Sequence, residues 1–420
     1  MIKVVCLESG DFSTMIKNEN NIPVGYKDSA VGVIPQEWEV KTLGELVSIT
    51  SGESPSSYVL SERGKYPFVK VEDMNNCIKF QNCSREYTNE EKHIVKRGSI
   101  IFPKRGAAIS NNKVRIAGCN MYMDSNMMAI FPNNTVDSVF LYYKITNEQL
   151  YRIADTSTIP QINNKHIIPY KICLPSFAEQ RQIVNIIGTW DEAIEKQTKL
   201  IKALEKRKQA LMQRLLSGLV RLPGFTRKWE TVRLGEIGKF ESGCVFSENE
   251  QGGKIGIPFY KVSDMNLYGN ETHMTTANNY VTYEQISRLK LNVITEESII
   301  FAKVGAAISL ERKRHAKKFI IDNNMLAFIP NQNISYMKYW FDNTSLSKYI
   351  QVGALPSYNA SDLAVIKLNL PPLEEQIAIA NILVSADDEI KRHNTKLSQL
   401  RKQKRGLMQQ LLTGKKRVRL

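Results

Sequence analysis

The chain has 420 residues, 42% of them hydrophobic, and carries a formal net charge of +15 at neutral pH. This length allows two or three domains with cores of their own. The excess of Lys and Arg predicts a polyanionic partner, most often nucleic acid, although a merely soluble basic surface would have the same composition. The six cysteines form no C-x-x-C pair, the five histidines are scattered, and we find no long apolar run or signal peptide. A zinc site, a disulfide framework and membrane insertion are therefore not indicated, and we expect a cytoplasmic protein.

The first part of the chain contains a leader and a globular domain. Residues 1–33 lack clear periodicity and predict a loosely structured leader. Residues 34–174 contain short strand-like runs, such as the alternating Phe-Val-Lys-Val at 68–71 and the apolar Ile-Ile-Phe at 100–102. Runs of this kind, separated by turn residues, predict a mixed α/β domain.

Residues 175–218 predict one long helix with defined ends. Ser176 and Glu179 match the S-x-x-E capping box, and Gly218 stands where a left-handed C-cap is needed. Apolar residues then recur on alternating steps of three and four, which is the spacing of a coiled-coil seam. A helix of about 40 residues spans about 60 Å and therefore requires a partner. The seam residues are Ile187, Trp190, Ile194, Ile201, Leu204, Leu211 and Leu215.

The second half of the chain repeats the first. A globular segment over residues 219–370 opens with Trp229 and Leu-Gly-Glu, as the first segment does with Trp38, and a second helix follows over residues 371–414. Polar residues interrupt both seams at matching steps, which two unrelated helices would not share, so the chain contains an internal duplication. The interruptions are Gln197, Lys208, His393 and Lys404. The second seam consists of Leu383, Ala386, Ile390, Leu397, Leu400, Leu407 and Leu411.

These elements predict an α+β fold with two tandem mixed α/β domains separated by two long helices. We expect the helices to pair as an antiparallel coiled coil, because each supplies the partner that the other needs. The basic tail at 415–420 repeats the linker that follows the first helix. Joining the two ends of the chain would therefore give a cyclic, pseudo-two-fold arrangement.

Catalytic motifs are not found in the sequence. No glycine-rich nucleotide loop follows a strand, and no P-loop occurs. The step at 369–372 lacks the aromatic residue and the order of the Asn-Pro-Pro turn of amino-methyltransferases. We interpret the acidic pairs at 191–192 and 387–388 as solvating charges, and His393 as a register device rather than a metal ligand. We therefore expect no catalytic residue, metal site or cofactor in this chain.

Basic loops at matching places in the two domains suggest a DNA interface. Positions that are basic in both copies suit sequence-neutral phosphate contacts. Arg105 is Val304 in the second copy, and a residue that differs in this way suits base readout, where a bidentate Arg discriminates by about 1–3 kcal/mol. Each of these charges could equally be a solvated surface residue, and the two Asn residues could form Asx turns. The candidate DNA-binding residues are Lys70, Lys104, Arg105, Arg115, Lys261, Lys303, Arg314, Asn75 and Asn266.

The order of these motifs resembles the specificity subunit of type I restriction–modification systems. The resemblance covers residues 34–420 and rests on four features that occur twice: the W-x-x-x-x-L-G-E opening, a strand-rich variable domain, the Leu-Pro and Glu-Gln pairs at the helix start, and the L-M-Q-x-L-L-x-G helix end. It implies two target-recognition domains that each read one half of a bipartite, gapped DNA site. Because the two domains differ, the site is expected to be asymmetric.

The resemblance also implies the partners. The paired helices are expected to set the gap and to dock two methyltransferase (modification) subunits, which hold S-adenosylmethionine. Restriction (motor–nuclease) subunits, which use ATP and Mg, are expected to cleave unmodified double-stranded DNA, so this chain would itself catalyse nothing. Two alternatives remain open: the specificity subunit of a methylation-only system, and a coiled-coil scaffold that binds only proteins. The net charge and the duplicated basic loops argue against the scaffold.

Overall fold

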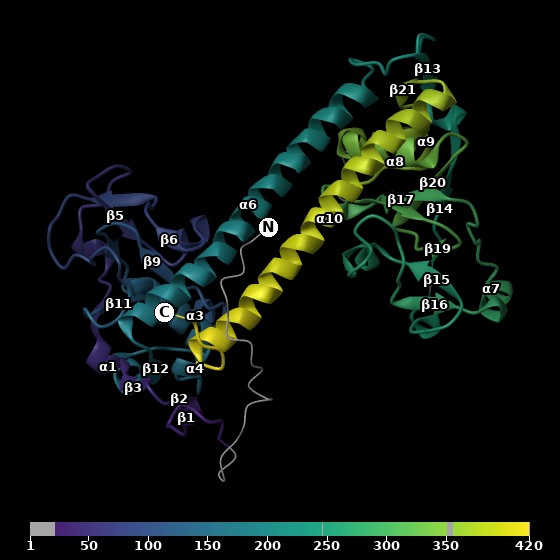
Figure 1. The fold of residues 1–420 in the computed structure, drawn as a ribbon. Helices are drawn as coiled ribbons and strands as arrows, with labels where there is room; N and C mark the ends of the chain where they lie inside the picture. The colour runs from purple at the N-terminus through teal and green to yellow at the C-terminus, as the bar shows by residue number, and fades with distance from the viewer. Residues whose placement is uncertain (1–21, 246, 351–355, 420) are drawn as a thin grey trace. The chain divides into compact units, whose positions relative to one another are not determined.

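The computed structural model describes residues 22–245, 247–350 and 356–419 (Figure 1). The chain divides into two compact units: the first contains residues 1–197 and 396–420, and the second contains residues 198–395. Each unit thus includes about half of each long helix. This division does not follow the six segments expected from the sequence, and the boundaries of those segments stay a prediction. The predicted leader lies largely outside the described residues.

The strands of the first unit form four small sheets within the described residues. A five-stranded sheet has the order β4-β11-β8-β9-β6, a three-stranded sheet has the order β10-β5-β7, and two further pairs are β3 with β12 and β1 with β2. The central strand β11 is apolar and almost entirely buried, as expected where both faces of a sheet are covered. The strands are β1 (Tyr26–Lys27), β2 (Ile34–Pro35), β3 (Glu39–Thr42), β4 (Val47–Ser51), β5 (Tyr66–Val69), β6 (Phe80–Gln81), β7 (Glu86–Thr88), β8 (Ile100–Pro103), β9 (Arg115–Ala117), β10 (Tyr122–Met123), β11 (Met127–Pro132) and β12 (Lys171–Leu174).

The second unit repeats this topology. Its four-stranded sheet, β14-β20-β17-β18, has the same order as β4-β11-β8-β9, and its other sheets are β16-β15-β19 and β13-β21. The predicted duplication is therefore present in strand order as well as in sequence. The strands are β13 (Glu230–Arg233), β14 (Gly238–Ser242), β15 (Ile257–Tyr260), β16 (Asn279–Val281), β17 (Ser298–Ala302), β18 (Lys313–Ala316), β19 (Ile320–Ile321), β20 (Met325–Pro330) and β21 (Lys367–Leu370).

Short helices connect the strands, and one helix of each unit covers the main sheet. Helix α3 starts where the Asp137 side chain accepts hydrogen bonds from two backbone amides, and the Asn333 side chain caps α8 by accepting one from the Tyr336 amide. The short helices are α1 (Leu43–Leu46), α2 (Ala107–Ser110), α3 (Ser138–Glu148), α4 (Leu150–Ile153), α5 (Asn164–Ile167), α7 (Tyr283–Leu289), α8 (Ile334–Asn343) and α9 (Ala360–Ala364). The 3-10 turns are η1 (Pro55–Ser57), η2 (Asp73–Asn76), η3 (Leu234–Glu236), η4 (Glu248–Glu250), η5 (Val262–Asn266), η6 (Gly305–Ala307) and η7 (Leu346–Tyr349).

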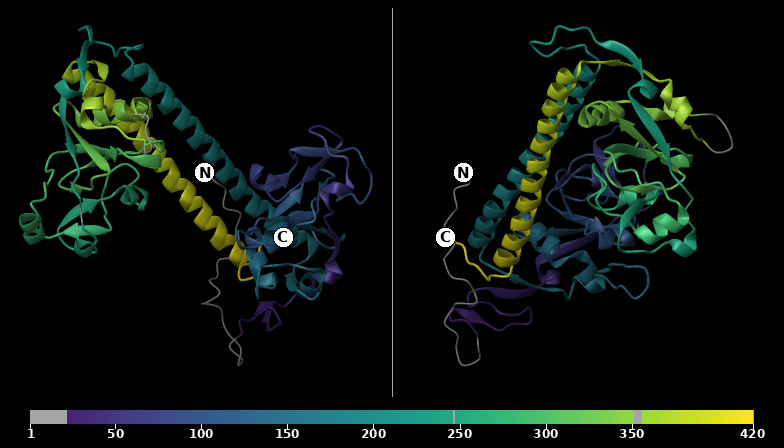
Figure 2. Two further views of the ribbon diagram at one scale, coloured as in Figure 1. Left: turned by 180° about the vertical axis from the view of Figure 1, so that it is seen from behind. Right: turned by 90° about the vertical axis from the view of Figure 1, so that its right-hand side faces the viewer.

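The two long helices are α6 (Phe177–Leu216) and α10 (Leu373–Leu412), each of 40 residues. Figure 2 shows both as continuous helices from two further sides. Gly218 and Gly414 follow their ends with φ of +74° and +73°, so the predicted left-handed C-caps are confirmed. No helix in the described residues is both long and apolar enough to span a lipid bilayer.

Within each unit the long helices pack antiparallel. In the first unit Asp191 pairs with Lys404, and Ile187 shares a core with Leu411. Residue numbers therefore rise along α6 while those of its neighbours on α10 fall. The second unit shows the same relation, and the predicted fold class is confirmed in each unit. Among the seam residues, the buried ones are Ile187, Ile201, Leu204, Leu215, Leu383, Ala386, Leu397 and Leu411. The half-buried ones are Trp190, Ile194, Leu211, Ile390, Leu400 and Leu407.

Candidate nucleic-acid interface

Several predicted phosphate contacts are engaged with protein atoms. The Arg115 guanidinium on β9 donates hydrogen bonds to the backbone carbonyls of Cys77 at 2.9 Å and Met74 at 2.9 Å. These bonds tie the loop after η2 to the main sheet. In the second unit Arg314 donates to the carbonyl of Lys313 at 3.1 Å, and burial lowers its pKa. Both side chains thus have structural partners, and DNA contacts through them stay a prediction.

The lysines and asparagines around the Asp-Met-Asn step are placed differently from one another. Lys70 forms an ion pair with Glu86, and Lys261 donates a hydrogen bond to Gln251 at 2.6 Å. Asn75 is exposed at the end of η2. Its counterpart Asn266 is also exposed and accepts a hydrogen bond from Arg312.

Aspartates rather than asparagines hold this turn. The Asp73 carboxylate is 1% exposed and accepts a hydrogen bond from the Lys70 amide at 2.9 Å. The Asp264 carboxylate is fully buried and accepts one from the Lys261 amide at 2.7 Å. Neither aspartate is among the residues predicted from the sequence. The signal was available, because each Asp stands three residues after the Lys whose amide it accepts from, and an acidic side chain at that spacing commonly caps the start of a helical turn.

The loop that carries Arg105 forms a short antiparallel bridge. Arg105 lies opposite Gln161, and the flanking bond joins the Gly106 amide to the Pro160 carbonyl at 2.9 Å. Arg105 is exposed, whereas its neighbour Lys104 is half-buried and its pKa is lowered by burial and by Arg105. Because successive residues of an extended chain point to opposite faces, the two basic side chains do not share one surface.

The second unit has the same bridge with different side chains. Val304 lies opposite Ser357, and the Gly305 amide donates to the Pro356 carbonyl at 2.8 Å. Lys303, like Lys104, is half-buried beside this bridge. The two units therefore present the same backbone with a basic and amide pair in one case and an apolar and hydroxyl pair in the other.

A partly buried polar cluster joins the first unit's sheet domain to the long helices. The Asp191 carboxylate on α6 accepts a hydrogen bond from the Tyr143 hydroxyl at 2.5 Å and pairs with Lys404 of α10 at 2.5 Å. Lys79 also reaches it, at 3.2 Å. Burial raises the pKa of Asp191, but the hydrogen bonds from Lys404 and Tyr143 outweigh burial and leave that pKa below its usual value. The interpretation of Asp191 as a solvating charge is therefore wrong.

The second unit contains the same cluster, which also explains the lysines in the seams. Asp387 accepts from the Tyr339 hydroxyl at 2.7 Å and pairs with Lys208 at 2.6 Å. Asp387 is thus no more a solvating charge than its counterpart. In each unit the seam lysine of one helix pairs with the aspartate of the other helix, and a tyrosine from α3 or α8 completes the cluster.

The Glu-Gln pair at each helix start is also buried. Glu179 accepts hydrogen bonds from the Trp38 indole at 3.0 Å and from Arg417 of the C-terminal tail at 2.7 Å. The predicted capping box is therefore formed only in part: the Glu179 amide donates to the Ser176 hydroxyl at 3.3 Å, but its carboxylate serves distant partners. In the second unit the three roles are taken by Glu375, Trp229 and Arg221.

The glutamine that follows is satisfied by backbone. Gln180 is fully buried and donates to the Pro175 carbonyl at 3.0 Å, while its carbonyl oxygen accepts from the Asp137 amide at 2.9 Å. Gln376 makes the equivalent bonds to Pro371 and Asn333. These glutamines lock each long helix to the cap of α3 or α8, so the residues that carry the family resemblance form the scaffold.

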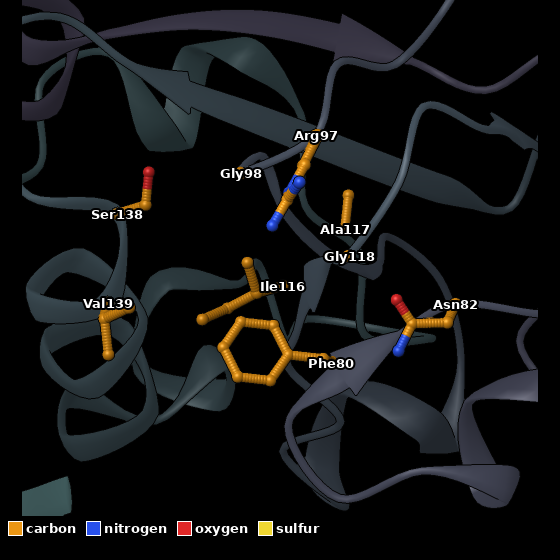
Figure 3. A pocket seen from close by; sticks show the side chains of 9 residues that line it. All are labelled: Phe80, Asn82, Arg97, Gly98, Ile116, Ala117, Gly118, Ser138 and Val139. Carbon is orange, nitrogen blue, oxygen red and sulfur yellow. The ribbon is translucent and has the colours of Figure 1, made fainter.

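In each unit a pocket lies at the start of the helix that covers the main sheet. In the first unit a pocket of about 390 Å³ is lined by Phe80, Ile116, Val139 and Arg97. Figure 3 shows Arg97 extending toward the apolar side chains. In the second unit a pocket of about 450 Å³ is lined instead by charged and imidazole groups. Those groups include Lys208, Glu271, His273, Arg314, His315, Lys338, Asp342 and Asp387.

The histidines of the second pocket lie edge to face, with ring centroids 4.8 Å apart. Burial lowers the pKa of both His273 and His315, and nearby cations add to the effect. Among the residues that the structure describes, no group of three or more His, Cys, Asp or Glu side chains could hold a metal ion.

Comparison with known proteins places this duplicated scaffold in a family. The family model for the type I restriction modification DNA specificity domain matches the chain twice, over residues 35–206 and 226–402. The MjaVIII specificity subunit of a type I restriction enzyme from Methanocaldococcus jannaschii is 27% identical over 92% of this chain and 94% of its own length. The MjaIX specificity subunit from the same organism is 23% identical over 94% of this chain and 96% of its own length.

Two solved structures share the fold. A structure from a study of complex assembly and conformational transition in the type I R-M system has a TM-score of 0.63 at 17% identity, covering 91% of this chain and 99% of that one. The S subunit from M. genitalium has a TM-score of 0.50 at 18% identity, covering 89% of this chain and 96% of that one. Because the two copies of the domain cover most of the chain, the protein belongs to the family of type I restriction–modification DNA specificity subunits.

Proposed function

We propose that this chain is the DNA sequence-recognition subunit of a type I restriction–modification complex and is itself non-catalytic. Each unit reads one half of an asymmetric, gapped site in double-stranded DNA. The observation that carries this proposal is the pattern of difference between the units: buried scaffold residues such as Glu179 and Glu375 are the same, whereas the exposed Arg105 and the half-buried Gln161 are replaced by Val304 and Ser357. A repeat that keeps its scaffold and exchanges its exposed loop residues suits a reader of two different sequences.

The long helices supply the second part of the proposal. They hold the gap between the half-sites and dock two methyltransferase subunits, which bring S-adenosylmethionine; restriction subunits with ATP and Mg complete the complex. Apolar side chains on the helices support a docking role, since Phe177, Leu373 and Ile377 are 45%, 52% and 41% exposed. Exposed apolar groups along a helix are typical of surfaces that another protein covers.

The test is methylation mapping by long-read sequencing in a host that lacks other DNA methyltransferases. The chain is co-expressed with its methyltransferase subunit, beside a control without the chain. We expect adenine methylation at one asymmetric, gapped motif, present only when this chain is expressed. Methylation that is unchanged by the chain, while the two subunits still bind each other, would contradict sequence recognition and favour a scaffold that binds only proteins. Cleavage of unmodified DNA by the complex then separates a full restriction system from a methylation-only one.

A further inference from the structure

We propose that base discrimination in the first unit is carried by Arg105 together with Gln161, and that Val304 with Ser357 occupies the same place in the second unit. This inference rests on the proposed function and assigns its specificity to particular side chains. Gln161 and Ser357 did not emerge from the sequence, because they lie more than 50 positions from their partners along the chain.

The geometry of the bridge places the two side chains together. Arg105 and Gln161 are directly opposite each other in an antiparallel bridge, and residues so paired project from the same face with Cβ atoms about 4.5–5.5 Å apart. The bridge is held by backbone bonds on both sides, from Gly106 to Pro160 at 2.9 Å and from Ile162 to Lys104 at 2.9 Å. A separation of about 5 Å lets two side chains address neighbouring bases, whose spacing is about 3.4 Å along a strand.

The loop that carries Gln161 is itself ordered. Asp155 exchanges both backbone hydrogen bonds with Gln161, at 2.9 and 3.0 Å, and its carboxylate accepts a further bond from the Ser157 amide at 3.0 Å. Asp155 is therefore a positioning residue for this loop. A reader that is fixed before binding discriminates better than one that must be ordered on the DNA.

The exposed chemistry of the pair suits direct readout. Arg105 is exposed and Gln161 is half-buried, so both residues are at least partly accessible from solvent. A guanidinium presents donors that match the O6 and N7 acceptors of guanine, and a glutamine amide presents a donor and an acceptor that match adenine. In the second unit, Val304 can contact only an apolar group such as the thymine methyl, and Ser357 hydrogen-bonds to several bases.

The two units share the backbone bonds of the bridge but differ in the side chains that the bridge presents. The backbone bonds of the second bridge, from Gly305 to Pro356 at 2.8 Å and from Tyr358 to Lys303 at 3.2 Å, match those of the first. The paired side chains nevertheless change from basic and amide to apolar and hydroxyl. Where a scaffold needs a particular side chain, as at Trp38 and Trp229, both units keep it.

The experiment exchanges the pairs in the full complex of this chain with its methyltransferase subunit. One variant is R105V/Q161S, which gives the first unit the second unit's pair, and the reciprocal variant is V304R/S357Q. Methylation is mapped by long-read sequencing, and half-site preference is measured as competition between duplexes that differ at one base pair. The matched control R63V/Q36S removes an exposed Arg and an exposed Gln elsewhere in the first unit.

We expect R105V/Q161S to relax or change one or two positions of one half-site, with a loss of about 5- to 150-fold in discrimination there. The other half-site, the gap and the control should keep the wild-type motif. V304R/S357Q should alter only the opposite half-site, so a first variant that fails to assemble does not remove the test.

Two outcomes overturn the assignment. An unchanged motif in both variants means that other side chains read the bases. A uniform fall in methylation, with the motif retained, means that the pair contributes only sequence-neutral affinity. Failure of the proposed function is distinguished at once, because the wild-type chain would then direct no motif at all.

Discussion

The two units solve the same structural problem with one difference at the joint between sheet domain and long helices. Both use a Tyr, Asp and Lys cluster, but the first unit adds Lys79, which reaches Asp191 at 3.2 Å. Thr272 occupies the equivalent position to Lys79 in the second unit. The backbone carbonyl of Lys79 accepts a hydrogen bond from an amide of β9 at 2.8 Å, and that of Thr272 accepts one from an amide of the matching strand β18 at 2.9 Å. Thr272 lines the pocket of about 450 Å³ together with His273 and His315.

The difference between Lys79 and Thr272 indicates at which positions the side chain can change while the fold stays the same. The residues that join helix to domain are alike in both units, while the residues beside the joint and on the exposed bridge are exchanged freely. A duplicated chain can therefore change what each unit contacts without altering how the unit is attached. Substitutions at the joint and at Glu311 test which of these residues stabilise each unit.

The largest effect is expected for loss of the buried glutamates. Glu179→Ala leaves the Trp38 indole without its acceptor and leaves the Arg417 guanidinium with Glu37 alone, which should cost about 3–5 kcal/mol of unfolding free energy in the first unit. Glu375→Ala should cost a similar amount in the second unit, because its partners are equivalent. Denaturant unfolding with hydrogen exchange resolved by peptide assigns each loss to its unit. A loss below about 1 kcal/mol in both variants would contradict the structural role.

Substitution of Asp191 and Asp387 should show directly that the two clusters differ in the number of partners that each aspartate has. Asp191→Ala removes three partners and Asp387→Ala removes two, so we expect losses of about 2–3 and about 1–2 kcal/mol respectively. Both clusters are partly accessible to solvent, which keeps these values below those for the glutamates. The same unfolding measurements apply, with Glu192→Ala, an exposed neighbour on α6, as the control. Equal losses would mean that Lys79 adds nothing to the joint.

Acid should weaken the second unit before the first. Burial raises the pKa of Glu311, but hydrogen bonds from Lys313, Ser347 and Ser345 lower it to about 2. A carboxylate whose pKa is depressed on folding stabilises the protein above its ordinary pKa of about 4.5, and that stabilisation is lost as the pH falls toward 2. Because solvent screens part of the effect, we expect on the order of 1–2 kcal/mol.

The first unit should not show this acid sensitivity, because Asn112, which does not titrate, occupies the place of Glu311 there. The Asn112 side chain accepts a hydrogen bond from the Leu150 amide at 3.0 Å. Hydrogen exchange between pH 5 and pH 2.5 should show opening of the second unit around residues 345–349. Glu311→Gln should be less stable at neutral pH and should lose that difference in acid. A difference that persists at low pH would rule out ionisation of Glu311 as its cause.

The smallest effect is expected for Lys79 itself. Lys79→Thr copies the second unit and leaves Asp191 with Tyr143 and Lys404, so the cost should be about 0.5–1 kcal/mol. Lys65→Thr, which removes a lysine from an exposed ion pair, serves as the control. Measuring Lys79→Thr in the Asp191→Ala background shows whether the two effects couple, as contacting residues should. Additive losses would indicate that Lys79 acts elsewhere.

Much of the architecture followed from local patterns in the sequence. The helices α6 and α10, their glycine ends and the duplication were all predictable, because helix ends and seams depend on residues within a few positions of each other. The high positive charge likewise predicted a polyanionic partner, most often nucleic acid. These features needed no knowledge of which distant segments meet.

The partners of single polar residues were decided only by the tertiary structure. Glu179 matched a local capping pattern, yet its carboxylate binds residues 141 and 238 positions away. Asp191 and Lys404 lie on separate predicted helices, where the sequence indicates a solvating charge for Asp191 and a polar interruption of the seam for Lys404. Only the packing of the helices shows that the two residues pair. Sequence patterns reveal which face of an element is apolar. A buried charge, however, is paired with the group that the fold brings within about 3 Å of it, and the spacing of residues along the chain does not predict which group that is.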